Sequence, residues 1–532
     1  MSSSLLQTYA DQKANSCPEK QAITDGKLSL TYKELSLQSN MLARCLISAG
    51  LERGDHVVLC MTRSPHFVLG MMGVLKADAV YVPIQAETPS QRRQKIMRDC
   101  RPKVMVCDST TIHKILMEGS FSEFPPVLVF LGGDYEVPQE HRNRVIRPQQ
   151  VNSYSSEFLA YKNDEDDLAC LHYTSGSTGD PKGVMISHRN IDEYVAWAVD
   201  CIDISDHDRI LGTAPFHFDM SLFDVYCSLR AGATLCIANE KLLLFPQLLV
   251  GFAEAENITI WKGVSSLLMY LARTGAVSWG RLPTLQKILF SGEVFHTKYL
   301  IQWMSMFPGK SFYNAYGPTE ATGISMYYHV ECMPLSADER IPLGKPCENT
   351  EVFLLDDNKK PVQPGEPGEI YIKGVCVTKG YLNDPEKTRT AFSDDSSNPM
   401  RKERIYKTGD YARLRPDGNY EFLGRRDNQV KYMGYRIDLS DIEQSLVSTP
   451  GVRDAGVILA ESSAGNLIEL VAYIEIDEGV SLFEIIPWLK DKLPPYMIPK
   501  QIHAIKRVPK ANSGKIDRQA LSAYHKEKSS KP

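Results

Sequence analysis

The chain has 532 residues, a formal net charge of −5 and 43% hydrophobic residues. This length exceeds one ordinary hydrophobic core, so we expect several subdomains of a globular rather than a disordered protein. The small net charge and the lack of a long basic run argue against nucleic acid as a partner.

Membrane insertion and export are not expected. No stretch approaches the ~18–20 uninterrupted apolar residues of a membrane span, and Met1 to Leu6 lack the basic and apolar segments of a signal peptide. The twelve cysteines are scattered without metal-binding spacing. This pattern favours reduced thiols in the cytoplasm over a disulfide framework or a zinc site.

The first three hundred residues alternate apolar runs with helical patterns. A helix is expected from the cap Thr31 to just before Gly50, and another over 67–76. Strands are expected at 57–60, 79–83, 168–172, 210–211, 233–238, 258–261 and 287–290. The alternation predicts an α/β fold with largely parallel sheets.

The pattern of apolar and turn-forming residues changes after about Glu351. Short strands at 352–355, 369–372 and 419–423, divided by Pro/Gly turns, predict a β-rich subdomain over about 345–426. Helices at 439–447 and 482–493 and strands at 455–459 and 468–476 follow. We therefore expect a core of layered α/β subdomains with a small β-barrel-like unit over 1–426, and a small α+β domain over 427–532.

The segment 173–188 reads YTSGSTGDPKGVMISH, a loop suited to holding phosphate. Its glycines let backbone N–H groups curl around an oxyanion, its hydroxyl groups add donors, and its lysine adds a cation. The spacing differs from that of a Walker P-loop. A flexible Ser/Gly linker is the alternative. The residues concerned are Thr174, Ser175, Gly176, Ser177, Thr178, Gly179 and Lys182.

A second motif, NAYGPTE over 314–320, combines groups that suit a nucleotide. Tyr316 could stack on a purine, Asn314 could bond its edge, and Glu320 could coordinate Mg²⁺ through oxygen. An ordinary Tyr-Gly-Pro turn is the alternative for this segment taken alone.

Two further segments are weaker signals by themselves. In YKTGD over 406–410, Asp410 follows a glycine turn and could accept both ribose hydroxyls, although Gly-Asp turns are common. Near the C-terminus, Lys515 lies on a glycine turn, where most lysines are merely solvated.

Taken in order over nearly the whole chain, these segments resemble the adenylate-forming superfamily. That superfamily includes acyl-CoA synthetases, luciferases and the adenylation domains of nonribosomal peptide synthetases. Further similar motifs are LKADAVYVP over 75–83, GEI over 368–370, GYL over 380–382 and GRRDNQVK over 424–431. The resemblance implies a large N-terminal and a small mobile C-terminal domain, with the hinge at Asp427. It also implies two reactions, in which a carboxylate attacks ATP to give an acyl-adenylate and a thiol then displaces AMP.

The resemblance also implies roles for individual residues. Lys515, Glu320 and His217 would be catalytic, with Glu320 holding Mg²⁺. ATP would be bound by the phosphate loop (Thr174–Gly179 and Lys182) together with Gly292, Glu293, Asn314, Ala315, Tyr316, Gly317, Pro318, Thr319, Asp410, Arg425 and Lys515.

Asp219, in the stretch APFHFDMSLFD, bears on the substrate class. The resemblance implies that this carboxylate binds the α-ammonium of an amino acid, and a buried carboxylate needs such a partner. Capping of the following helix is the alternative. The implied pocket is lined by Asp219, Met220, Phe223, Lys262, Leu289, Ser291, Ala315, Gly323 and Ile324. Because most of this lining is apolar, we expect Lys262 to point outward; pointing inward, it could bind an acidic side chain.

The expected function is ATP-dependent activation of a small amino acid, with a resemblance to stand-alone ligases for D-alanine or proline. About fourteen residues follow Arg518, so we expect the phosphopantetheine carrier to be another chain. Aspartate-type specificity and an acyl-CoA synthetase using free CoA remain alternatives. A non-catalytic protein of the same fold is disfavoured, because Lys515, Glu320 and Asp410 are all present.

Overall fold

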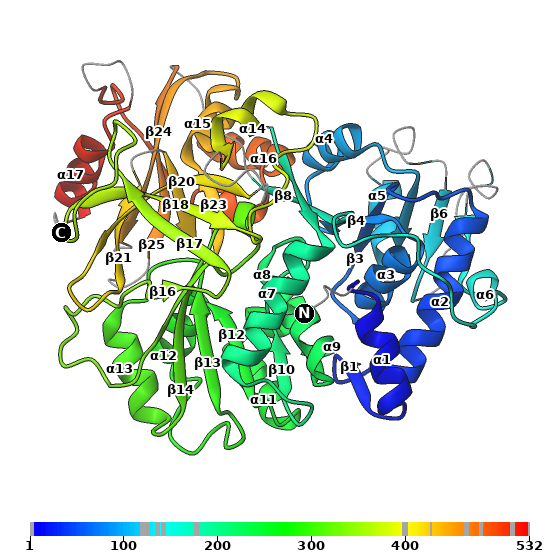
Figure 1. The fold of residues 1–532 in the computed structure, drawn as a ribbon. Coiled ribbons are helices and arrows are strands. Elements are labelled where there is room, and N and C mark those ends of the chain that lie inside the picture. Colours follow the sequence, from blue (N-terminus) through cyan, green and yellow to red (C-terminus); the bar gives the residue numbers. More distant parts are fainter. Residues whose placement is uncertain are drawn as a thin grey trace. The chain divides into compact units, whose positions relative to one another are not determined.

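The structure is a computed structural model of the whole chain (Figure 1). It describes residues 5–117, 125, 127–132, 139, 145–174, 180–395, 403–425, 428–461, 468–477, 482–510 and 516–529. By internal contacts the chain divides into two compact units. The first comprises 1–86, 97–173 and 183–426, and the second 87–96, 174–182 and 427–532.

A seven-stranded sheet holds the strands expected in the first part of the chain. Its order is β7-β6-β5-β3-β4-β8-β9, and neighbouring strands from β7 to β8 run parallel. The strands are β3 (His56–Met61), β4 (Val80–Gln85), β5 (Val104–Cys107), β6 (Val127–Phe130), β7 (Val145–Ile146), β8 (Leu168–Thr174) and β9 (Lys182–Ser187). The predicted strands at 57–60, 79–83 and 168–172 are confirmed.

A nine-stranded sheet follows, in the order β16-β15-β14-β13-β12-β10-β11-β1-β2. Its centre from β14 to β1 is parallel, and β15, β16 and β2 join antiparallel. The strands are β1 (Gln21–Thr24), β2 (Ser29–Thr31), β10 (Arg209–Gly212), β11 (Thr234–Ile237), β12 (Ile260–Val264), β13 (Lys287–Ser291), β14 (Ser311–Tyr316), β15 (Met326–His329) and β16 (Lys345–Pro346).

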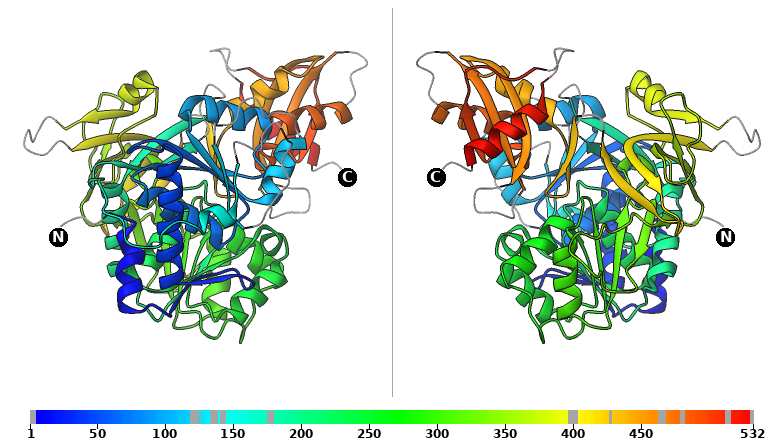
Figure 2. Two further views of the ribbon diagram at one scale, coloured as in Figure 1. Left: turned by 90° about the vertical axis from the view of Figure 1, so that its right-hand side faces the viewer. Right: turned by 90° about the vertical axis from the view of Figure 1, so that its left-hand side faces the viewer.

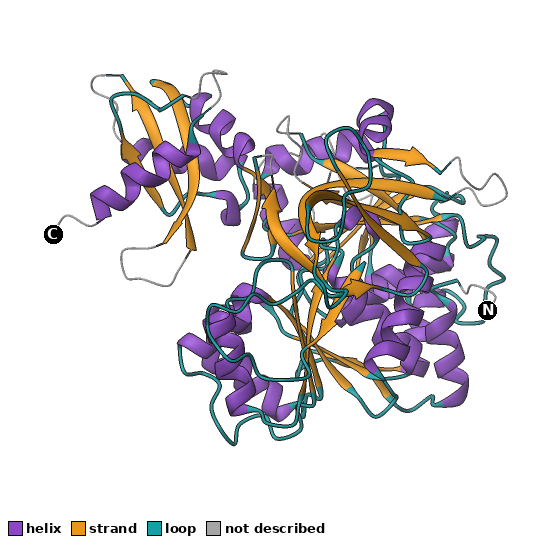
Figure 3. Ribbon diagram, turned by 60° about the vertical axis from the view of Figure 1, so that its left-hand side comes forward, coloured by secondary structure: helices purple, strands orange, loops and turns teal. Residues whose placement is uncertain are grey.

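Helices cover both faces of these strands (Figure 3). The predicted helix after Thr31 is confirmed as α2, which begins with a capping box in which Thr31 and Glu34 exchange side-chain and backbone hydrogen bonds. Helices α1 and α2 lie side by side (Figure 2). The helices before residue 310 are α1 (Thr8–Ser16), α2 (Tyr32–Ser48), α3 (Pro65–Lys76), α4 (Ser90–Cys100), α5 (Ser109–Met117), α6 (Pro148–Val151), α7 (His188–Ile202), α8 (Met220–Leu222), η3 (Phe223–Cys227), α9 (Ser228–Ala231), α10 (Glu240–Leu244), α11 (Pro246–Ala255), α12 (Ser265–Arg273) and α13 (Thr297–Met306).

The β-rich subdomain forms a five-stranded sheet with α14 (Pro385–Ala391). Its strands are β17 (Thr350–Leu355), β18 (Pro367–Gly374), β19 (Phe392–Asp394), β20 (Arg404–Leu414) and β21 (Tyr420–Arg425). The expected turn at YKTGD is wrong, because these residues lie within β20. Gly409 has a φ of +77°, and the pairing of β20 with β18 shifts register beside it. A bulge in a strand, not a chain reversal, therefore presents Asp410.

The second unit has its own core and mixes helices with short sheets. It contains the hairpin β22 (Gln429–Tyr432) and β23 (Tyr435–Asp438), and the sheet β24 (Val452–Glu461), β25 (Ile468–Ile476) and β26 (Gln501–Ala504). Among its described residues after 427, the helices are α15 (Leu439–Val447), α16 (Leu482–Lys492), the short η5 (Pro495–Met497) and α17 (Arg518–Ser529). The predicted α/β class, with an α+β arrangement in this unit, is confirmed.

The cysteines and helices can be compared with the predictions of reduced thiols and of no membrane insertion. All twelve cysteines carry free thiols, and nine of them are buried. Among the helices of the described residues, none has the length and apolar character needed to cross a bilayer.

Candidate active site

The phosphate loop connects two neighbouring strands, β8 and β9. Residues Ser175 to Gly179 lie outside the described residues. Thr174, at the end of β8, buries a hydroxyl for which the described residues offer no hydrogen-bond partner. A Cβ on Gly183 would lie 2.9 Å from the Tyr173 ring, so the glycine after Lys182 is required by close packing.

The second and third motifs meet in the structure. The Tyr316 hydroxyl donates to Oδ2 of Asp410 at 2.5 Å, and Nη1 of Arg425 pairs with Oδ1 of the same carboxylate at 2.6 Å. All three side chains are buried or nearly so. Burial and the Asp410 charge raise the pKa of Tyr316 well above its ordinary value, so the phenol remains a donor. Strands β14, β20 and β21 therefore assemble one polar cluster from residues up to 109 positions apart.

Glu320 lies in a short helical turn, η4 (Thr319–Ala321), and is completely buried. Its Oε1 accepts a hydrogen bond from the Tyr381 hydroxyl at 2.7 Å, which joins the second motif to the GYL segment. Among the described residues no group of three or more His, Cys, Asp or Glu side chains could hold a metal. A single carboxylate fits Mg²⁺ bound mainly through nucleotide oxygens and water, which is how this ion is commonly held.

Two other residues predicted to bind ATP, Asn314 and Glu293, form hydrogen bonds within the protein. Nδ2 of Asn314 donates to the carbonyl of Pro342 at 2.7 Å, and Oε1 of Glu293 accepts from the backbone N–H of Ser266 at 2.9 Å. Gly292 has a φ of +90° at the end of β13. Gly317 has no room for a side chain, because a Cβ would lie 2.1 Å from the Gly323 carbonyl oxygen. Of the remaining positions, Ala315 and Pro318 are buried and Thr319 is partly exposed.

Four predicted pocket residues share one face of the nine-stranded sheet. Lys262 is opposite Leu289, and Ser291 is opposite Ala315, across the parallel pairs β12–β13 and β13–β14. Because side chains alternate along a strand, Leu289 and Ser291 point to the same side. Leu289 and Ala315 belong to a core shared with Phe223 and Tyr194, whereas their neighbour Phe290 packs in a different cluster. The sheet thus brings together residues that are far apart in sequence.

Asp219 is buried to 7% exposure at the start of α8. Its side chain makes no capping hydrogen bond, so the capping alternative is wrong. Within the part of the chain that is described, no hydrogen bond or ion pair reaches this carboxylate. A nearly buried anion without such a partner suits a cationic ligand group.

Lys262 points inward, and the expected outward orientation is wrong. The side chain is 2% exposed, and its Nζ donates to the carbonyl of Met220 at 3.0 Å. The ammonium also lies 5.3 Å from the centre of the Phe223 ring. Burial lowers the pKa of Lys262, while Asp224 and Asp219 oppose that change. The ammonium of Lys262 remains buried among apolar side chains because a carbonyl, an aromatic face and two carboxylates stabilise it.

Sequence reasoning missed two polar residues of this region, Asp224 and His172. Burial raises the pKa of Asp224 to about 7, although Lys262 and Arg63 lower it. Nδ1 of His172 donates to the carbonyl of His217 at 3.1 Å, and burial lowers the pKa of His172. A single polar residue within an apolar run, as in LACLH and SLFDVYC, is the signal that marks both.

The remaining predicted residues are placed as follows. His217 is half-buried with its ring 4.4 Å from that of Phe218, Gly323 has a φ of +83°, and Ile324 is buried. Lys515 and Asp427 lie outside the described residues.

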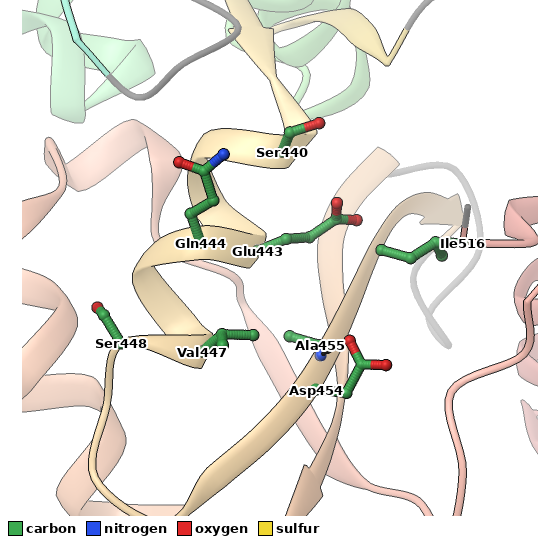
Figure 4. Close-up of a pocket in the computed structure, with 8 residues that line it drawn as sticks. All are labelled: Ser440, Glu443, Gln444, Val447, Ser448, Asp454, Ala455 and Ile516. Carbon is green, nitrogen blue, oxygen red and sulfur yellow. Dashed lines mark hydrogen bonds between the residues drawn. The ribbon is translucent and has the colours of Figure 1, made fainter. Parts of the chain in front are cut away.

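A pocket of about 430 Å³ lies in the second unit, and none of its lining residues is among the predicted site residues (Figure 4). Helix α15 and strand β24 supply most of its lining, which consists of Ser440, Glu443, Gln444, Val447, Ser448, Asp454, Ala455 and Ile516. Its acids already have partners: Glu443 pairs with Arg518 and Asp454 with Lys510, each at 2.7 Å. Burial raises the pKa of Glu443 to about 7, against the effect of Arg518.

The chain matches two family models. The AMP-binding enzyme model covers residues 10–382, and the AMP-binding enzyme C-terminal domain model covers 441–515. Zwittermicin A synthase ZmaJ of Bacillus cereus is 33% identical over 99% of this chain and 96% of its own length. Tyrocidine synthase 3 of Brevibacillus parabrevis is 33% identical over 97% of this chain, which spans only 8% of that relative.

A solved structure supports the same fold. The Vibrio cholerae adenylation domain AlmE, in complex with glycyl-adenosine-5'-phosphate, matches with a TM-score of 0.85 and 21% identity over 98% of both chains. Together with the matched models and the relatives, this fold agreement identifies the family. The chain belongs to the AMP-binding enzymes of the adenylate-forming superfamily, which include the adenylation domains of nonribosomal peptide synthetases.

Proposed function

We propose that this enzyme activates a small, proline- or alanine-like amino acid with ATP as an aminoacyl-AMP. The aminoacyl group then passes to the phosphopantetheine thiol of a separate carrier protein. The single observation that carries the amino-acid assignment is Asp219, a nearly buried carboxylate without a hydrogen bond or ion pair from the described residues. The α-ammonium of an amino acid is the complement that such a site requires.

The other residues act through charge and alignment, which adenylation needs more than covalent help. The phosphate loop would hold the β- and γ-phosphates, and Glu320 would hold Mg²⁺. Asp410, already fixed by Tyr316 and Arg425, would accept the ribose hydroxyls. Lys515 would bridge the substrate carboxylate and the α-phosphate.

The relatives support a place in peptide natural-product assembly. ZmaJ has nearly the same extent as this chain, and its name is that of a zwittermicin A synthase. We expect a cytoplasmic enzyme that works with a carrier protein and without nucleic acid. Cell-wall polymer biosynthesis is the other setting in which loading of a carrier with alanine would fit.

A second candidate substrate is an amino acid with an acidic side chain. The buried ammonium of Lys262 favours it, because the described residues give that ammonium one hydrogen-bond acceptor, the Met220 carbonyl. A substrate carboxylate would give this ammonium a hydrogen-bonded anionic partner, in addition to the field of Asp224 and Asp219. An acyl-CoA synthetase is less compatible with the site, since a substrate without an amine leaves Asp219 unpaired.

ATP–pyrophosphate exchange with a panel of amino acids tests the proposal. The panel contains proline, both alanine enantiomers, serine, glycine and aspartate, with acetate and propionate as acids that lack an amine. We expect exchange with at least one amino acid and a loss of at least about 100-fold in kcat/KM for Asp219→Ala, because a charged contact in a buried site is removed. Exchange supported only by acids without an amine contradicts the assignment.

The Lys262→Leu variant separates the two substrate classes. If the enzyme uses aspartate, this variant should lose aspartate exchange and keep exchange with neutral amino acids. The matched control is Lys76→Met, which removes another buried lysine whose ammonium pairs with Asp11 at 2.6 Å. The control should lower the melting temperature without changing the order of preferred substrates.

A further inference from the structure

Several buried polar atoms lie without hydrogen-bond partners around the predicted substrate pocket. Within the described residues they include the Tyr194 hydroxyl, Oδ1 of Asp224, Nε2 of His172 and Oγ of Ser291. A buried polar group without a partner is rare in folded proteins and calls for a bound water, ion or ligand. Four such atoms near one site indicate that the protein alone does not complete its polar contacts.

Tyr194 is the member of this set that is best placed to meet a substrate side chain. It lies on α7, is 4% exposed, and shares a core with Phe223 and Leu289. A Cβ built on Gly323 would lie 3.2 Å from Cζ and 3.4 Å from the hydroxyl oxygen of Tyr194. The phenol end of Tyr194 is therefore against Gly323, one of the positions expected to line the pocket.

The chemistry of this hydroxyl is that of a donor. Burial raises the pKa of Tyr194 well above its ordinary value, and Asp219 and Asp224 raise it further. The phenol accordingly stays protonated, and its O–H has no acceptor among the described residues. The ammonium of Lys262, which serves the same pocket face, is a second donor with one protein acceptor. Both donors would be satisfied by oxygen on a ligand.

We propose that Tyr194 is a further specificity-determining residue whose hydroxyl donates a hydrogen bond to an oxygen on the substrate side chain. The preferred amino acid then bears a hydroxyl, amide or carboxylate side chain rather than a purely aliphatic one. This inference rests on the part of the proposed function that assigns an amino acid to Asp219, and it replaces the aliphatic, proline- or alanine-like side chain proposed there with a polar one. A site built to bond a polar group discriminates strongly against an analogue that lacks the group.

The test uses the full chain and matched pairs of amino acids in ATP–pyrophosphate exchange. The pairs are serine with alanine, threonine with valine, and aspartate and asparagine with 2-aminobutyrate. For the best pair we expect the wild type to prefer the oxygen-bearing member by at least about 10-fold in kcat/KM. Tyr194→Phe should lower kcat/KM for that member about 10-fold or more, and change the apolar member less than about 3-fold.

A stability measurement distinguishes this role from a structural one. Tyr194→Phe removes a hydroxyl that has no protein partner, so its melting temperature should equal or exceed that of the wild type. The control Tyr32→Phe removes a buried hydroxyl that donates to the carbonyls of Ala233 at 2.7 Å and Ser228 at 3.1 Å. The control should melt at a lower temperature with unchanged substrate preference.

The outcomes are separable. A wild-type preference for the apolar members, or an equal effect of Tyr194→Phe on both members of a pair, overturns the role of Tyr194 while the proposed function stands. A fall in the melting temperature of Tyr194→Phe as large as that of Tyr32→Phe also overturns it. Absence of exchange with every amino acid refutes the proposed function itself.

Discussion

Three ionisable side chains lie buried beside one another at the predicted substrate face: Asp219, Asp224 and Lys262. None of them forms an ion pair with another residue in the described part of the chain, although Asp224 and Asp219 both act to raise the pKa of Lys262. Buried charges without close partners are destabilising, and such arrangements are common at functional sites. The protein thus retains at this place ionisable groups that a purely structural core would not need.

The raised pKa of Asp224 gives a prediction at the residue scale. The folded state holds the proton up to pH about 7, whereas the unfolded state releases it near pH 3.8. Rising pH therefore favours the unfolded state across this window, and the effect is complete above about pH 7. Asp224→Asn does not titrate. Raising the pH from 5 to 8 should therefore increase the free energy of unfolding of this variant, relative to that of the wild type, by up to about 3 kcal/mol. Urea unfolding at four pH values measures the difference.

A difference between Asp224→Asn and the wild type that does not vary from pH 5 to pH 8 would show that the carboxyl titrates normally. Lys262→Met in the same series measures how much the nearby ammonium lowers the pKa of Asp224. It removes the charge that most lowers the pKa of Asp224, so the pH window of the wild-type effect should move upward.

At the scale of elements, strands carry Tyr316, Arg425 and Lys262, and a turn and a bulge shape the rest of the predicted site. The turn after β14 brings Gly317 against the backbone of Gly323, and the bulge in β20 carries Asp410. Both devices depend on glycine, in the first case for space and in the second for a positive φ at Gly409. The positions of the predicted site residues therefore depend on the backbone conformation at these two glycines.

Gly317→Ala tests that coupling. Its Cβ would meet the Gly323 carbonyl oxygen at 2.1 Å, so the backbone of the turn has to move. We expect a loss of about 1–3 kcal/mol in the free energy of unfolding, as in other overpacked sites, and at least about a 10-fold fall in the adenylation rate. Thermal melts and pyrophosphate exchange measure these effects.

The control is Gly251→Ala, within α11, where a Cβ meets nothing within 4 Å and φ is not positive. It should stabilise the protein by about 0.5–1 kcal/mol, because alanine favours a helix, and leave adenylation unchanged. Equal behaviour of the two variants would show that the turn at Gly317 tolerates a side chain.

At the scale of the whole molecule, the division into two units ends the first unit at Arg426 and begins the main part of the second at Asp427. The proposed hinge and the proposed catalytic Lys515 then belong to the smaller unit. If that unit serves two reactions in turn, the two reactions should respond differently to substitutions within it.

Lys515→Ala provides the measurement. Loss of the bridging cation should lower adenylation at least about 100-fold, whereas transfer from a chemically prepared aminoacyl-AMP to the carrier thiol should persist within about 3-fold. Asp427→Pro, which restricts the proposed hinge, should instead slow the complete cycle more than either half-reaction alone. Unchanged adenylation by Lys515→Ala refutes the bridging role.

Much of the fold could be predicted from the sequence, because apolar periodicity and caps act over a few residues. The strands at 57–60, 79–83 and 287–290 and the helix after Thr31 are found as β3, β4, β13 and α2. The long strand β20 was missed, since the Gly-Asp pair inside it has the composition of a turn. Composition does not distinguish a bulge within a strand from a chain reversal.

The sequence by itself determined the α/β class, the order of the nucleotide motifs and, through them, the family. These features depend on local spacing, which is visible in one dimension. Only the tertiary structure decided that Lys262 points inward, that Asp219 caps no helix, and that Tyr316, Asp410 and Arg425 form one cluster. Burial and partners depend on which distant strands and helices pack together, so neither follows from the order of the residues alone.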